Sequence, residues 1–115
     1  MLRTELELLE AEAKEYKKVV EFAQAVKRLE LNKDFKKVFT EGYFKDEAVR
    51  LVHLRSDPEC QSKADQENIL KALDAIGHLS QYLKKAILEG DLALKQIAMN
   101  EDIQQELIAE GLNNE

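Results

Sequence analysis

The sequence predicts an all-α protein of one domain, folded as an elongated antiparallel helical hairpin with coiled-coil-like arms and a small two-helix head. Charged residues make up 35% of the 115-residue chain and aromatic residues 6%, with one Pro and four Gly. This composition is typical of long, solvated helices. Apolar residues also recur with alternating spacings of four and three in two long stretches, which is the repeat of a supercoiling helix.

The first arm is expected over residues 3–31. Its apolar positions alternate by four and three residues and form one narrow seam: Leu2, Leu6, Leu9, Ala13, Tyr16, Val20 and Ala23. From Val19 a second apolar row begins, which widens the face of the helix. The outer part of the arm therefore presents a narrow seam that can pack against one neighbouring helix. The inner part presents a wider face that can pack against two.

The head is expected over residues 32–57 and contains two short helices. Asn32 or Asp34 suits the N-cap of the first helix, and Gly42 suits a left-handed C-terminal position. The second helix starts near Tyr43 or Asp46. It ends at Asp57, because the residue before a proline disfavours helix.

The second arm is expected to begin after Ser62 and to cover residues 63–110. Its seam repeats the same alternation through Ile69, Leu73, Ile76, Ser80, Leu83, Ile87, Gly90, Leu94 and Ile97. Beyond Ile97 the apolar pattern changes phase, which indicates a stutter or bend, and residues 111–115 are expected to fray. A helix the length of the first arm spans about 44 Å, whereas a compact 100-residue domain has a radius of gyration of about 13 Å. The predicted shape is therefore elongated.

Four aromatic residues fall within ten positions of the head. Phe35 and Phe39 are assigned to its core, where each ring buries a large area. Tyr43 and Phe44, beside Gly42, either complete this core or project as anchors toward a protein partner, because aromatic anchors dominate interface energetics. Both roles can hold at once. Along the arms, the partner-binding positions are the seam residues Leu6, Leu9, Leu94 and Ile97, which we expect to mediate homo-oligomerisation.

Catalytic chemistry is not indicated by any spacing in the chain. His53, His78 and Cys60 have no neighbours that suggest a triad, a metal site or an activated thiol. The four glycines are isolated, so no phosphate-binding loop precedes a helix. We expect no catalytic, cofactor-binding or metal-binding residue, and a protein that is not an enzyme.

Charge is unevenly distributed along this acidic chain, which carries a formal net charge of −6. Residues 1–13 and 100–115 are acidic, whereas residues 14–37 contain eight bases against four acids. Five of these bases lie close to Phe35 and Phe39 and are the candidate nucleic-acid contacts: Lys27, Arg28, Lys33, Lys36 and Lys37. The overall acidity argues against nucleic acid as the main partner. Nucleic-acid binding, or mimicry of DNA by the acidic ends, is the second functional candidate.

The central segment also carries a resemblance. Asn32-Lys33-Asp34-Phe35, Glu41-Gly42-Tyr43-Phe44, Glu47-Ala48-Val49-Arg50-Leu51 and Asp57-Pro58 resemble small helical proteins encoded among the virion-assembly genes of tailed bacteriophages. The similar part is about a quarter of the chain and contains no catalytic motif. The resemblance implies a non-enzymatic assembly or virion role with a portal, tail or internal protein as partner.

These patterns together predict a protein-interaction module that functions in the host cytoplasm and, if packaged, in the virion. The N-terminal turns are acidic and lack an apolar run of signal-peptide length. No stretch approaches the roughly 18 apolar residues of a membrane span. We therefore expect no membrane partner.

Overall fold

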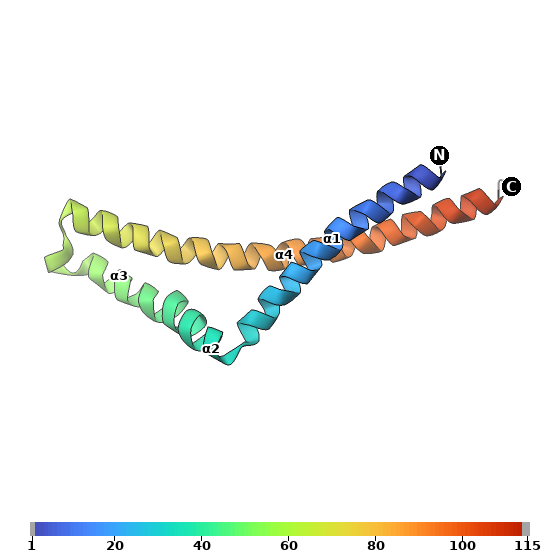
Figure 1. Cartoon of the computed structure of the whole chain (residues 1–115). Coiled ribbons are helices and arrows are strands. Elements are labelled where there is room, and N and C mark those ends of the chain that lie inside the picture. Colours follow the sequence, from blue (N-terminus) through green and yellow to red (C-terminus); the bar gives the residue numbers. More distant parts are fainter. Residues whose placement is uncertain (1, 114–115) are drawn as a thin grey trace. The chain divides into compact units, whose positions relative to one another are not determined.

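The computed structural model describes residues 2–113, and nearly all of them are helical (Figure 1). No strand occurs within this range, so the predicted all-α class is confirmed. In chain order the elements are α1 (Leu2–Leu31), α2 (Lys33–Phe35), the π-helix η1 (Lys36–Glu47), α3 (Ala48–Ser56), the short 3₁₀ helix η2 (Pro58–Cys60) and α4 (Lys63–Asn113).

The chain divides into two compact units. Unit 1 contains residues 2–25 of α1 and residues 86–113 of α4, and unit 2 contains residues 26–85. Helices α1 and α4 thus each contribute one segment to unit 1 and another segment to unit 2. Both units have the antiparallel helix pairing of a helical hairpin.

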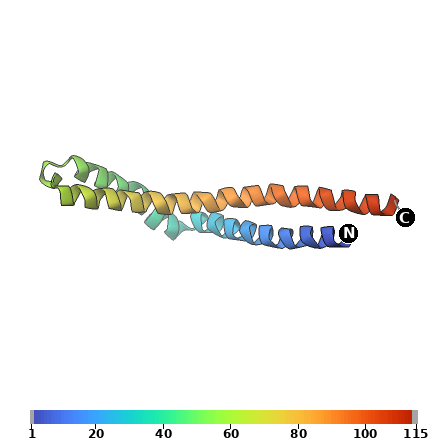
Figure 2. The same cartoon turned by 90° about the horizontal axis from the view of Figure 1, so that it is seen from above.

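Unit 1 is a pair of antiparallel helices. The Asn100 side chain donates a hydrogen bond to Glu12, and the Gly90 backbone lies against Ala23. Later residues of α1 therefore contact earlier residues of α4, as antiparallel helices require. Figure 2 shows these two segments running side by side. On α1 the predicted seam faces inward, since Leu6, Leu9, Ala13 and Tyr16 are half-buried and Val20 and Ala23 are buried. The side chain of Leu2 lies outside the described residues.

In unit 2, Asn32 interrupts the helix after the last turns of α1. Its side-chain Oδ1 accepts hydrogen bonds from the backbone N–H groups of Asp34 and Phe35 at 2.9 and 3.0 Å, which is the predicted N-cap. The chain then stays helical without a break from Lys33 to Ser56. The prediction of two separate short helices is therefore wrong.

Gly42 explains the difference. It lies inside the π-helix η1 with a helical backbone, since no described glycine has a positive φ. A Cβ placed at this position would lie 3.1 Å from the Lys37 carbonyl oxygen, so the missing side chain relieves a close approach within the wide helical turn. Gly42 therefore allows η1 to continue through this position, whereas it was expected to end an α-helix.

A hydrogen-bonded turn joins α3 to α4. The Asp57 side chain accepts from the N–H of Glu59 at 2.9 Å, and Ser62 Oγ accepts from the N–H of Asp65 at 3.1 Å at the start of α4. The Gln66 amide donates to the carbonyl oxygens of Arg55 and Cys60. These bonds satisfy backbone groups that helix ends leave without partners.

The core of unit 2 consists of large apolar side chains. Leu51 from α3 and Ile69 and Ile76 from α4 are buried together. Tyr43 and Phe44 pack against this cluster, and their rings lie 5.7 Å apart. This packing agrees with the interpretation of these two residues as part of the head core, while their role as anchors for a partner stays a prediction.

The C-terminal part of α4 differs from the prediction in two respects. The helix continues to Asn113, so the expected fraying is wrong for residues 111–113, while residues 114–115 lie outside the described residues. The helix is also unbroken near the predicted stutter. Its inward face keeps the four-three spacing through positions that are not all apolar: Ala86, Gly90, Ala93, Ile97, Asn100, Gln104 and Leu107.

Candidate protein-interaction surface

Small side chains line the inner side of unit 1. Ala86 and Ala93 of α4 are buried, as is Ala23 of α1. A Cβ placed on Gly90 would lie only 2.2 Å from the Cβ of Ala23, so the two helices approach as closely as a missing side chain allows. Close backbone approach excludes large residues from this part of the seam.

A polar pair lies further along the same seam. Asn100 is 2% exposed, and its Nδ2 donates to Glu12 Oε2 at 3.2 Å. A single polar residue at a seam position fixes register at a cost in stability. Sequence reasoning missed this pair, although Asn100 follows Ala93 by seven residues and so occupies the same seam position.

Large apolar side chains lie on the outside of α4 in the same unit. Leu88, Leu92, Met99 and Ile103 are 58%, 54%, 55% and 41% exposed. Spacings of four, seven and four residues place them on one face of the helix. We call this set the outer stripe. A helix that is apolar on two sides is expected to be covered on both.

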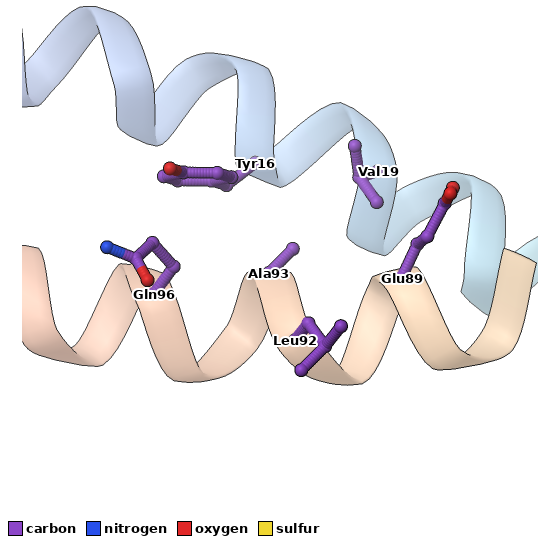
Figure 3. A pocket seen from close by; sticks show the side chains of 6 residues that line it. All are labelled: Tyr16, Val19, Glu89, Leu92, Ala93 and Gln96. Carbon is purple, nitrogen blue, oxygen red and sulfur yellow. The ribbon is translucent and has the colours of Figure 1, made fainter.

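A groove between α1 and α4 borders the outer stripe (Figure 3). It has a volume of about 290 Å³ and is lined by Tyr16, Val19, Glu89, Leu92, Ala93 and Gln96. In Figure 3 the Tyr16 ring lies between the two helices, and Ala93 points toward α1 from the opposite side. Leu92 belongs to both features, so the groove and the outer stripe form one surface.

The helix pair also has a second, more polar groove. It is lined by Lys14 and Lys17 of α1 and by Glu101 and Gln104 of α4, together with Ile97 and the buried Asn100. Charged side chains along the edges of a groove are typical of a surface that faces solvent. Unit 1 therefore has one apolar groove and one groove with a largely polar lining. Exposed apolar side chains also lie outside the outer stripe: Leu8, Phe22, Leu94 and Ile108.

The predicted partner residues of the arms fall in different places. Leu6, Leu9 and Ile97 are half-buried in unit 1, on the inward side. Leu94 was expected in the seam but is exposed, because the buried position beside it is taken by Ala93. The outer stripe that the structure reveals shares none of these four residues.

All five candidate nucleic-acid contacts are exposed: Lys27, Arg28, Lys33, Lys36 and Lys37. They come from the end of α1, from α2 and from the start of η1. The rings of Phe35 and Phe39 stack on each other at 5.0 Å and are half-buried. The two aromatic residues thus support each other within η1 and its N-terminal flank.

Reactive groups are sparse in the described part of the chain. Within it, no three His, Cys, Asp or Glu side chains lie together as a metal site would require. Burial raises the pKa of the half-buried Cys60 thiol above its ordinary value, and the nearby charges of Asp57, Asp65 and Glu59 raise it further. The thiol is therefore protonated at neutral pH.

No helix in residues 2–113 has a run of apolar residues sufficient to cross a bilayer. Comparisons of the chain with protein-family models, with curated proteins and with solved structures gave no match.

Proposed function

We propose that this chain is a non-enzymatic protein-interaction module that docks another protein through the outer stripe of unit 1 and the groove beside it, as an accessory structural protein of phage virion assembly. One observation carries the docking part of the proposal. Helix α4 presents small buried residues to α1 and large exposed residues to the outside.

The energetics favour reversible binding. Fully burying a Leu, Ile or Met side chain contributes about 1.5–3 kcal/mol. The four residues of the outer stripe are about half exposed, so covering them contributes roughly 3–6 kcal/mol for each chain. Association costs about 4–15 kcal/mol in lost freedom. Because the free energy gained by covering the outer stripe is close to the cost of association, we expect association that depends on protein concentration.

Light scattering after size exclusion tests the association. We expect a mass above the 13.2 kDa of one chain, rising with concentration. Leu92→Glu combined with Met99→Glu should return the mass to that of one chain. Val49→Glu with Val52→Glu is the matched control, since both valines are exposed on α3 of unit 2. A strict monomer at high concentration would remove self-association from the proposal.

The virion role is supported by the resemblance of residues 32–58 to small phage assembly proteins. It places the protein in the host cytoplasm during assembly. The test is a phage that carries this gene with an early stop codon, grown in suppressing and non-suppressing hosts. We expect incomplete particles to accumulate without suppression, and normal particle yield would contradict the role.

Nucleic-acid binding is the second candidate, favoured by the exposure of the five bases around Asn32. Contacts of Lys and Arg with phosphate predict affinity that falls steeply with salt. A gel shift with duplex DNA at low ionic strength should detect such binding. A matched variant in which Lys33, Lys36 and Lys37 are replaced by Gln should weaken it, and no shift at low salt would eliminate this candidate.

A further inference from the structure

We infer that the outer stripe takes a second copy of this chain, with the two α4 helices antiparallel and related by a two-fold axis between Lys95 and Gln96. This inference rests on the proposed function and names the partner at the same surface. It commits to one occupant and to one orientation.

The first argument is the symmetry of the outer stripe itself. Leu88 and Ile103 are equally far from the midpoint between Lys95 and Gln96, and so are Leu92 and Met99. A two-fold interface uses the same patch on both subunits and must be self-complementary. Antiparallel α4 helices satisfy this condition, because Leu88 then meets Ile103 of the second copy and Leu92 meets Met99 of the second copy.

The groove supplies a receptor for one of these contacts. It lies beside Leu92 and has a volume of about 290 Å³, with Tyr16 and Ala93 in its lining. Met99 of the second copy would approach Leu92 and so reach the groove. Methionine is unbranched and fills irregular gaps, which suits an open groove of this kind.

Charge selects the orientation. The terminal half of unit 1, residues 3–13 and 96–113, contains eight acids against one base. The inner half, residues 14–25 and 86–95, contains four acids and four bases. Parallel copies would bring two strongly acidic ends together, and like charges across an interface are unfavourable. Antiparallel copies keep the two acidic ends apart. Lys95, which lies on the same face between Leu92 and Met99, is close to Lys95 of the second copy in either orientation and does not distinguish them.

Chemical cross-linking tests the arrangement with the full-length chain. All variants carry Cys60→Ser, which removes the single native thiol. Leu88→Cys and Ile103→Cys replace exposed residues, so both should fold with the helicity of the parent protein. A short bis-maleimide should link a mixture of the two at least tenfold more efficiently than either variant alone. Lys95→Cys, beside the axis, should link to itself.

Two results would overturn the inference. Efficient linking of Leu88→Cys to itself would show parallel copies. Failure of the mixture to link, at concentrations where light scattering shows a dimer, would place the interface elsewhere. In both cases the interaction module proposed above would survive, because association would still occur. A chain that remains monomeric in light scattering removes this inference, while the stop-codon experiment tests the assembly role separately.

Discussion

Large side chains form the buried cluster of unit 2, whereas the buried apolar residues of α4 in unit 1 are alanines. In unit 2, Leu51, Ile69 and Ile76 are buried together and covered by Tyr43 and Phe44. In unit 1 the buried positions include Ala23, Ala86 and Ala93, and the four large residues of the outer stripe are exposed. Apolar burial stabilises in proportion to area. Unit 2 therefore buries a cluster of large side chains, whereas unit 1 leaves the outer stripe of α4 exposed. Unit 2 also has exposed apolar side chains: Leu29, Leu31, Val38, Val49, Val52, Leu70 and Tyr82.

The largest expected difference between the units comes from truncating a leucine in each. Leu51→Ala leaves a cavity in the core of unit 2 and should cost about 2–5 kcal/mol of unfolding free energy. Leu92→Ala removes a side chain that is half exposed in unit 1 and should cost less than about 1 kcal/mol, measured below the concentration of association. Urea denaturation provides both values. Equal losses would show that Leu92 belongs to the core of the single chain.

Two glycines of α4 provide the next test. Gly90→Ala should destabilise by about 1–2 kcal/mol, because its Cβ overlaps Ala23 and the helices must separate. Gly77→Ala has no atom within 4 Å of the added Cβ and should stabilise by about 0.5–1 kcal/mol through helix propensity. Thermal unfolding of the two variants should shift in opposite directions. Combining Gly90→Ala with Ala23→Gly should restore part of the loss, and a Gly90→Ala protein more stable than the parent would refute the close approach.

The buried amide in unit 1 should have a smaller effect. Asn100→Ala removes the hydrogen bond to Glu12, which contributes about 0.5–1.5 kcal/mol. Asn68→Ala is the control, because Asn68 is exposed on the same helix and reports the gain in helix propensity alone. The difference between the two variants in urea isolates the buried pair. A difference of zero would indicate that the pair does not hold the register of α1 on α4.

The smallest effect concerns an exposed ion pair of unit 2. A side-chain hydrogen bond from Arg50 lowers the pKa of Glu47 below its ordinary value. A carboxyl group with a lowered folded-state pKa contributes stability above its unfolded pKa, and this contribution is lost as pH falls through the folded pKa. Wild type should therefore be slightly more stable than Glu47→Gln at pH 7, with the advantage disappearing on acidification. A constant difference in melting temperature across this range would exclude the linkage.

The sequence predicted the helical class, the seam of α1, the cap at Asn32 and the start of the second long helix after Ser62, because periodicity and capping chemistry are local properties. It misplaced Leu94, since a leucine at a seam position is normally buried. Because Gly90 lies so close to Ala23, the small side chain of Ala93 occupies the buried position next to Leu94, and Leu94 is exposed. Whether a small or a large residue is buried there depends on the distance between α1 and α4, and the sequence of one segment does not determine that distance.

The head shows the same limit. Gly42 was expected to end a helix, but a π-helix continues through it, and Tyr43 and Phe44 thereby reach the core. A change from α- to π-helical hydrogen bonding rotates every later side chain relative to an α-helical projection. The outer stripe was not predicted, because its four residues lie outside the expected seam.

Hydroxyl-radical footprinting at low and high protein concentration tests the central claim most directly, because it reports the solvent exposure of individual side chains. Leu92 and Met99 of unit 1 should react readily when dilute and be protected when concentrated. Val49 and Val52 of unit 2, which are 50% and 53% exposed, should react equally at both concentrations. Unchanged reactivity of Leu92 and Met99, or protection of the two valines instead, would contradict the assignment of unit 1 as the interaction surface.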